Sequence, residues 1–246
     1  MTAPRLILAH TRLMLLDLLR SPAYLIPTIF FPTMFFLIFA VPNARQPARA
    51  DFVTLSFVAF AIIGVTLFQF GVGIAAERGR PWERYLRTLP AGAAVRFAAR
   101  IACALAFGLC AAALVAITAR LTTPMDFGPA QWMRLGLYAV AGAIPFVLFG
   151  IAIGYWVSAR AALPIANIFY LLLSFAGGLW MPPRFLPGIA ATISPYLPTR
   201  QFGELLWSIV GAGDATRALP ALAVYSIVFA ILAAIGYRRD ERTRYA

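Results

Sequence analysis

Six long stretches of the chain contain no charged side chain, and this limits the fold more than any other feature. They are residues 21–44, 52–76, 101–119, 135–159, 161–183 and 218–237. Each can form a helix that crosses a bilayer, which takes about 20 apolar residues. With 62% hydrophobic and 12% charged residues, the chain has more apolar side chains than a water-soluble core can bury. The sequence therefore predicts an all-α integral membrane protein with six transmembrane helices, in one domain over residues 1–246.

The arginines predict the orientation of these helices. If the spans alternate in direction, two thirds of the 21 basic residues fall on the side of the termini. These are Arg5, Arg12, Arg20, Arg78, Arg80, Arg84, Arg87, Arg96, Arg100, Arg160, Arg238, Arg239, Arg242 and Arg244. Because positive charge is retained in the cytoplasm, we expect both termini and the 77–100 loop to be cytoplasmic. The net charge of +12 is thereby explained without a nucleic-acid partner.

The missing residue types exclude most catalytic functions. All basic residues are arginine, so the chain lacks the lysine required by a Walker A loop, a protein kinase or a pyridoxal-phosphate site. The single histidine, His10, lies outside every uncharged stretch, which disfavours a His/Cys metal site. Proton relays and ion-coupled transporters usually carry ionisable residues inside their spans, and none is present there. We therefore expect neither a catalytic residue nor a cofactor on this chain.

Residues 3–20 form a predicted amphipathic helix. Its apolar side carries Ile7, Leu8, Met14, Leu15, Leu18 and Leu19, and its polar side carries Arg5, Arg12 and Arg20, although Leu6, Leu13 and Leu16 interrupt the polar side. Such a helix is typical of the membrane interface. The alternative is a signal peptide. The uncharged stretch 21–44 is longer than a signal's apolar core and contains four prolines, which favours an uncleaved first span.

The most informative segment is the loop between the second and third stretches. Pro81 suits the start of a helix and Pro90 its end. Between them, Trp82, Tyr85, Leu86 and Leu89 recur at helical spacing and form one stripe, opposite Glu83, Arg84 and Arg87. Two interpretations remain open: the helix lies on the inner leaflet, or it docks into a groove on a cytoplasmic partner.

Three segments, in this order along the chain, resemble the ABC-2 type permeases, the membrane subunits of ATP-binding cassette exporters. The first is Asp17-Leu18-Leu19-Arg20-Ser21-Pro22. The second runs from Glu77-Arg78-Gly79 through Trp82-Glu83-Arg84 to Leu86-Arg87-Thr88-Leu89-Pro90. The third runs from Gly177-Gly178-Leu179-Trp180-Met181-Pro182-Pro183 through Leu186-Pro187-Gly188 to Ser194-Pro195-Tyr196-Leu197-Pro198. The sequence differs from the family where Ser194-Pro195 replaces the usual Asn-Pro and where Pro198 is an additional proline.

The resemblance implies specific partners. The loop would be a coupling helix seated on an ATPase subunit, with Glu77, Arg78, Gly79, Pro81, Trp82, Glu83, Arg84, Tyr85, Leu86 and Arg87 at the interface. The amphipathic N-terminal helix would contact the same subunit through Arg12, Asp17 and Arg20. Two permease chains, expected to be a homodimer, would assemble with two ATPase subunits in a bacterial cytoplasmic (inner) membrane. ATP and Mg would be bound by the partner and not by this chain.

Several residues within or between the spans have a weaker functional signal. Gln69 and Asn167 are amides at membrane depth that either bond neighbouring helices or line a substrate path between spans one, two and five. Gly150 and Gly154 indicate close helix packing, within the chain or in a dimer. The Pro-rich segment 182–210 between the last two spans is predicted to re-enter the membrane, with an outer aromatic belt of Trp180, Phe185, Tyr196, Phe202 and Trp207.

These expectations describe an exporter permease for an amphipathic or lipid-like compound such as a drug, a metabolite or a glycolipid. A polysaccharide exporter of the same family is the nearest alternative. A stand-alone membrane anchor or assembly factor, whose 77–100 loop lies only on lipid, is an alternative from another functional class.

Overall fold

Five helices cross the molecule. The computed structural model describes residues 3–20, 26–78 and 93–245, and these ranges contain helices and no strand. The helices long and apolar enough to span a membrane are Pro47–Glu77, Ala98–Thr122, Pro129–Trp156, Ala159–Ala176 and Ala215–Glu241. They correspond to the second, third, fourth and sixth predicted spans and to the first part of the fifth. The fifth prediction, 161–183, was too long, because α9 ends at Ala176 and Gly178 then adopts a positive φ of 81°. The first predicted span, 21–44, is represented by the shorter apolar helix Thr28–Asn43, so its full length remains a prediction.

The elements occur in the following order along the chain. They are α1 (Ala3–Leu19), η1 (Ile26–Phe30), α3 (Phe31–Phe35), η2 (Phe36–Ala40), η3 (Val41–Asn43), α4 (Pro47–Thr66), η4 (Leu67–Val72), α5 (Gly73–Glu77), α7 (Ala93–Thr122), α8 (Pro129–Trp156), α9 (Ala159–Ala176), η5 (Pro183–Phe185), α10 (Gly188–Ile193), η6 (Ser194–Tyr196), α11 (Pro198–Trp207), η7 (Ser208–Val210) and α12 (Ala215–Tyr245). Here η1, η2 and η4 are wider π-helical turns, and the other η elements are 3₁₀ turns.

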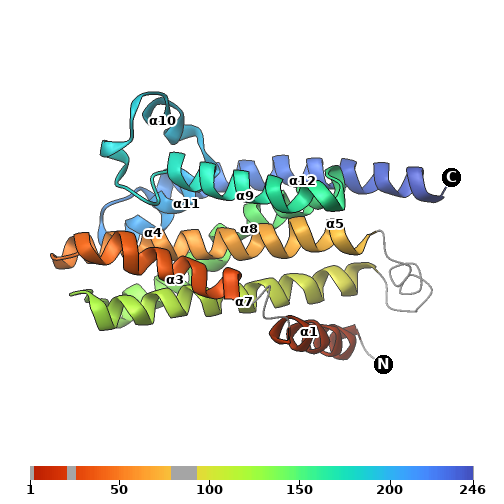
Figure 1. Cartoon of the computed structure of the whole chain (residues 1–246), viewed down its shortest axis with the longest axis horizontal. Helices are drawn as coiled ribbons and strands as arrows, with labels where there is room; N and C mark the ends of the chain where they lie inside the picture. Colours follow the sequence, from red (N-terminus) through yellow and green to blue (C-terminus); the bar gives the residue numbers. More distant parts are fainter. Residues whose placement is uncertain (1–2, 21–25, 79–92, 246) are drawn as a thin grey trace.

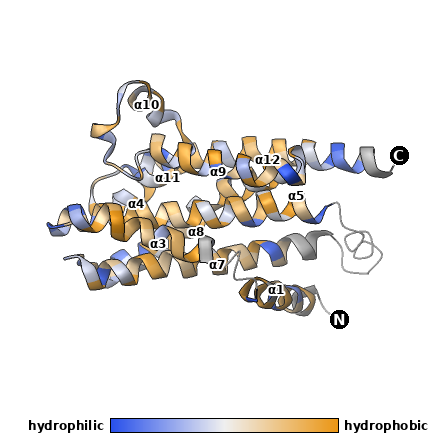
Figure 2. Cartoon of the chain, in the orientation of Figure 1, coloured by the Kyte–Doolittle hydropathy of each residue, from blue (hydrophilic) through white to orange (hydrophobic). Residues whose placement is uncertain are grey.

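The long helices run side by side, and α1 lies apart from them beside the first half of α7 (Figure 1). Both termini lie at the same end of the bundle, together with the end of α5 and the start of α7. Figure 2 shows hydrophobic residues along the middle of the helices and hydrophilic residues near their ends. This distribution is the one that a bilayer around the middle of the bundle requires.

The centre of the bundle is α4. Every residue from Thr54 to Leu67 is buried, because α3, α7, α8 and α11 pack around this helix. Gly150 and Gly154 of α8 allow close contact on the same side: a Cβ atom at either position would lie within 3 Å of a carbonyl oxygen, that of Thr66 or that of Phe70. The small residue pair therefore packs within the chain, as one of the two interpretations predicted.

Several helices extend well beyond the uncharged stretches. α7 begins at Ala93 and includes Arg96 and Arg100, whereas the stretch begins at 101. α12 continues to Tyr245 through a charged C-terminal part. A charged residue ends a bilayer-spanning stretch, but it does not end the backbone hydrogen bonding of a helix. The predicted bounds therefore mark the apolar part of each helix and not its ends.

The segment between α9 and α12 folds into short helices, of which α11 belongs to the core. Phe202 and Trp207 are 0% and 1% exposed, so their prediction as members of an outer aromatic belt is wrong. The indole Nε1 of Trp207 donates to Ser56 Oγ of α4 at 2.8 Å, and its ring stacks on Phe52 at 4.6 Å. α11 is amphipathic, and its apolar side faces α4, α8 and α12. Whether the segment re-enters a membrane remains a prediction.

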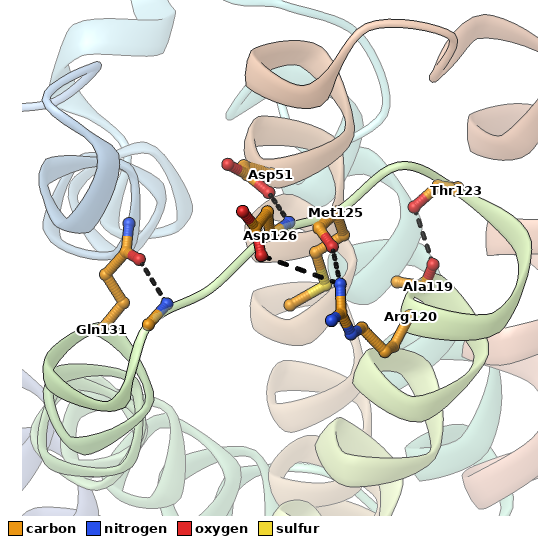
Figure 3. Close-up of polar contacts among 8 residues, drawn as sticks. Asp51, Ala119, Arg120, Thr123, Met125, Asp126 and Gln131 are labelled. Carbon is orange, nitrogen blue, oxygen red and sulfur yellow. Dashed lines mark hydrogen bonds and ion pairs between the residues drawn. The ribbon is translucent and has the colours of Figure 1, made fainter.

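The ends of α4, α7 and α8 far from the termini are joined by polar contacts (Figure 3). Arg120 at the end of α7 donates to the Met125 carbonyl at 2.6 Å and lies 3.8 Å from the carboxylate of Asp126. The backbone N–H of Asp126 donates to Asp51 Oδ1 of α4 at 3.2 Å. Because the Arg120–Asp126 pair is largely exposed, it contributes little stability, and these contacts mainly fix the loop.

Candidate functional site

Most of the predicted docking loop lies outside the described residues. This applies to Gly79, Pro81, Trp82, Glu83, Arg84, Tyr85, Leu86 and Arg87. The two ends of the loop are described: α5 ends at Glu77, and α7 begins at Ala93. Both lie at the end of the bundle that carries the termini (Figure 1). The docking role of the loop remains a prediction, and its described ends show which helices the loop is attached to.

Arg78 connects three parts of the chain at this end of the bundle. Its guanidinium donates to the carbonyls of Tyr155 and Val157, at 2.5 and 2.6 Å, in the turn between α8 and α9. It also forms an ion pair of 3.2 Å with Asp240 of α12. The two charged side chains are only 14% and 9% exposed. Arg78 thus fixes the last residue before the loop to the C-terminal end of α8 and to α12.

Glu77, the preceding residue, binds the other side of the loop. Its carboxylate accepts a hydrogen bond from Nη2 of Arg100, which lies on α7 after the loop. The Glu77 side chain is 44% exposed and that of Arg100 14%. Ion pairs at exposed positions contribute little, whereas hydrogen bonds to half-buried charges are stronger. Glu77 and Arg78 therefore connect the loop to both helices that carry it and to two more, α8 and α12.

The N-terminal helix α1 packs on α7 near the same place. The Thr11 hydroxyl donates to the Ile7 carbonyl of its own helix at 2.8 Å and lies 3.4 Å from the Ala99 carbonyl of α7, and Met14, Leu15 and Leu18 pack against the bundle. Arg12 and Arg20 are exposed, so both are accessible to a partner, as predicted for partner contacts. The Asp17 side chain lies outside the described residues. The partner contacts of α1 remain a prediction.

The two membrane amides lie on different helices and have different partners. The Gln69 amide of η4 is buried and donates to Cys103 Sγ of α7 at 3.9 Å. The Asn167 amide of α9 donates to the Leu163 carbonyl of its own helix at 3.2 Å. Gln69 thus links two helices, which favours the structural interpretation of this residue. Its place in a π-helical turn keeps a functional role open, since such turns are frequent at functional sites.

An aromatic cluster joins the first, second and fifth predicted spans. The "aromatic seam" consists of Phe35 of α3, Phe60 of α4, Tyr170 of α9 and Trp180 after α9. Phe60 and Tyr170 stack with centroids 4.4 Å apart, and Trp180 lies 5.6 Å from Phe35 and 5.8 Å from Phe60. Trp180 is therefore partly buried against the bundle, and its membership of an outer aromatic belt stays a prediction.

Polar atoms without partners collect around this seam. Among the described residues, the buried side-chain atoms that lack a hydrogen-bond partner include two of the seam itself, Tyr170 OH and Trp180 Nε1. Two more, Thr33 Oγ1 and Ser174 Oγ, lie on α3 and α9, which contribute to the seam. Leaving a buried donor or acceptor unpaired costs about 1–3 kcal/mol for each group. Such a concentration of unpaired groups marks a place where the fold carries a cost that packing alone does not explain.

In the described ranges, no group of three or more His, Cys, Asp or Glu side chains could hold a metal ion. The candidate sites are the polar contacts of Glu77 and Arg78 at one end of the bundle and the aromatic seam within it.

Residues 5–210 match a family described as ABC-2 type transporter. The chain belongs to this family. It is also 25% identical over 228 residues to a protein of Bacillus subtilis (strain 168) named "Putative transport permease YvfS". The matched region covers 91% of this chain and 93% of that protein. No solved structure matches the chain. The protein is thus an ABC-2 transport permease, a multi-pass membrane component of a transporter that is not itself the catalytic subunit.

Sequence reasoning missed two parts of this ABC-2 permease. The partners of Arg78 and Glu77 could not be read from the sequence, since Asp240 lies 162 residues from Arg78. The aromatic seam was missed because Phe35, Phe60 and Tyr170 each look like ordinary apolar residues of a span. The only available signal was that Trp180 lies two residues after the glycine pair Gly177-Gly178, near the end of the fifth predicted span.

Proposed function

We propose that this permease is the membrane subunit of an exporter that moves an amphipathic or lipid-like compound, such as a drug, a metabolite or a glycolipid, out of the cytoplasm. A separate ATPase subunit supplies the energy. The complex contains two permease chains, as a homodimer, and two ATPase subunits in the bacterial inner membrane. The absence of lysine supports this division of labour, because ATP and Mg must then be bound by another chain.

The observation that carries the proposal is the attachment of the loop ends. Glu77 binds α7, and Arg78 binds the α8–α9 turn and α12. Helices and buried polar contacts transmit displacements because they are rigid. A movement that an ATPase imposes on the loop would therefore reach α4–α5, α7, α8 and α12 together. An anchor or assembly factor has no need for such a junction.

The orientation supports the same proposal. Both termini and both ends of the loop lie at one end of the bundle, which is the end that the arginine bias assigns to the cytoplasm (Figure 1). Cytoplasmic ATPase subunits can reach only this end. The exposed Arg12 and Arg20 of α1 are available there as well.

The aromatic seam supports an amphipathic substrate. Its stacked rings offer apolar surface, and its unpaired hydroxyl and indole groups offer hydrogen bonds. A molecule with a flat apolar part and a few polar groups would satisfy both. The competing polysaccharide substrate is supported by the outer side chains of Phe185 and Tyr196, which are 57% and 77% exposed and suited to stacking on sugars.

Site-directed crosslinking tests the partner. In a variant without Cys103 and Cys110, a single cysteine is introduced as Arg84→Cys in the loop, or as Arg184→Cys in η5 as the matched control. The permease is co-expressed with an ATPase encoded by a neighbouring gene. We expect a crosslink to the ATPase from Arg84→Cys alone. A crosslink only from Arg184→Cys, or no co-purifying ATPase at all, would refute the proposal and favour the membrane anchor.

Transport tests the role of the junction. In membrane vesicles that contain the permease and the ATPase, Glu77→Ala and Trp82→Ala should lower ATP-dependent efflux of a fluorescent amphipathic dye while both subunits still assemble. Wild-type vesicles that export labelled oligosaccharide and not the dye would favour the polysaccharide alternative. Undiminished dye efflux by both variants would exclude a coupling function of the loop.

A further inference from the structure

The second span contains a π-helical turn between two α-helical parts. η4 joins α4 to α5 within one continuous helix, Pro47–Glu77. The N–H of Gly73, at the end of η4, bonds to the carbonyl of Phe68, five residues back, and to that of Phe70. A turn with such bonds holds about one residue more than an α-helical turn. η4 therefore acts as an insertion of one residue in an otherwise α-helical span.

The helix is held in place on both sides of this insertion. Before η4, every residue from Thr54 to Leu67 is buried among the neighbouring helices. After η4, Glu77 pairs with Arg100 of α7, and Arg78 bonds to the end of α8 and to Asp240 of α12. These contacts determine which face α5 turns toward each neighbour. They are made in a register that includes the additional residue of η4.

A span that was α-helical throughout would present other residues to the same partners. Without the additional residue, α5 turns by roughly 100° about its axis and advances by about 1.5 Å, the step of one residue in an α-helix. Glu77 then takes the place of Arg78, opposite Asp240, and Ala76 takes the place of Glu77, opposite Arg100. A carboxylate would face a carboxylate there, and like charges in a half-buried site repel each other. The charges at the end of α5 therefore favour the π form of η4.

We propose that η4 is a register switch of the second span, held in its π form by Glu77 and Arg78, which becomes α-helical when the loop is drawn away from their partners. The surroundings of η4 permit this rotation. On the side of α8 the turn lies against Gly150 and Gly154, which have no side chain to block it. Val72, at its end, is only half-buried. An ATPase subunit that engages the loop would supply the displacement, and this one step rests on the proposed function.

Moving the positive charge by one residue tests the switch without an ATPase. Arg78→Gln removes the contacts made in the π register, and adding Glu77→Arg supplies a guanidinium to Asp240 in the α register. In detergent, we expect the midpoint of thermal unfolding, which Arg78→Gln lowers, to rise again by about 3–6 °C in the double variant. Asp240→Asn should abolish this recovery. A double variant without recovery, or a recovery that persists with Asp240→Asn, would overturn the proposal.

Deletion of Val72 is an independent test that covers a failure of the charge variants to fold. With one residue fewer, the span can be α-helical throughout while Glu77 and Arg78 keep their partners, so unfolding should occur near the wild-type temperature. Deletion of Ala111 from α7, which is α-helical throughout, is the matched control and should prevent folding.

The same deletion separates a change of register from a flexible side chain that merely reaches across. In the Val72 deletion, Glu77→Arg should no longer rescue Arg78→Gln, because η4 has no additional residue left to absorb the shift. Equal damage by the two deletions, or rescue in the Val72 deletion, would overturn the proposal.

Transport tests whether the permease uses the switch. In vesicles that contain the ATPase, the permease without Val72 should assemble but lose ATP-dependent dye efflux, since its second span has a single register. Efflux equal to that of the wild type would overturn the switch. Wild-type vesicles without any efflux would instead refute the proposed function, whereas the unfolding measurements in detergent judge the switch by themselves.

Discussion

Replacing Arg78 tests the junction at the loop directly. In Arg78→Gln the carbonyls of Tyr155 and Val157 lose their charged donor, and Asp240, 9% exposed, loses its ion pair with Arg78. Breaking a buried ion pair from one side costs about 3–5 kcal/mol. The junction lies at an end of the bundle where water can approach, so we expect the lower part of that range, about 3 kcal/mol. At about 2–4 °C for each kcal/mol, the midpoint of thermal unfolding should fall by roughly 6–12 °C.

A double-mutant cycle with Asp240→Asn separates the ion pair from the two carbonyl contacts. Unfolding in detergent micelles, followed by circular dichroism, gives the free-energy change of each variant, and the coupling between the two positions should be about 1–3 kcal/mol. Arg78→Lys keeps the charge but cannot reach three acceptors in a planar arrangement, so it should recover only part of the loss. Arg238→Gln, exposed on the same helix as Asp240, is the control and should change stability by less than about 0.5 kcal/mol.

The reasoning fails if Arg78→Gln behaves like the Arg238→Gln control, or if the coupling with Asp240 is zero. In the first case the contacts of Arg78 with Tyr155, Val157 and Asp240 carry no net free energy, and they do not fix the loop to α8 and α12. In the second case the ion pair with Asp240 does not stabilise the attachment of the loop to α12.

Three further changes test other parts of the fold. Gly150→Leu should prevent close packing of α8 on η4, because a Cβ atom at this position would lie 2.9 Å from the Thr66 carbonyl oxygen, and the yield of folded protein should fall. Gly136→Leu is the control: a Cβ atom there has no neighbour within 4 Å, so the yield should not change. Trp207→Phe removes the indole donor to α4 and should cost about 1 kcal/mol in a denaturation assay. Hydrogen bonds from Thr216 lower the pKa of Asp214, at the start of α12, below its usual 3.8. The charged carboxylate therefore contributes its whole stabilisation at pH values well above 3.8, and this stabilisation is lost as the pH falls from 3.8 through the lower pKa of the folded state. Over this pH range the wild type should lose stability relative to Asp214→Asn.

The positions of the helices follow from the sequence, because a bilayer gives each span the same simple requirement. Uncharged stretches of about 20 residues predicted the positions of five helices. The arginine bias assigned both termini to one side of the membrane, and in Figure 1 both termini lie at the same end of the bundle. The true ends of α7 and α12 were not predictable from the same rule. Their charged terminal turns continue the helix outside the apolar region, where hydropathy carries no information about backbone hydrogen bonds.

The contacts between helices could not be predicted, for a different reason. Inside a bilayer the hydrophobic effect does not determine which helices pack together. Close side-chain packing and a few polar contacts between helices determine it instead. Trp207 illustrates this: it reads as an interfacial residue, but Ser56, 151 residues away, gives its indole a buried partner. Arg78 likewise reads as a docking residue, and the structure shows it bound to α12 and to the α8–α9 turn. Both roles are compatible for Arg78, since a docking loop must be anchored.

Tyr170→Phe distinguishes a packing role of the aromatic seam from a functional one. The hydroxyl of Tyr170 is buried without a partner in the described residues and lies 2.8 Å from where a Cβ atom of Gly64 would be. Removing it keeps the ring that stacks on Phe60 and removes an unpaired polar atom, so the variant should be as stable as the wild type or more stable, by up to about 1–3 kcal/mol. If the seam opens during transport, the same hydroxyl bonds water or substrate in the open state, and dye efflux should fall although stability rises. Such opposite effects are expected where a fold retains a costly group for function. A less stable Tyr170→Phe would show that the hydroxyl has a partner within the protein, and a variant with unchanged efflux would assign the seam to packing alone.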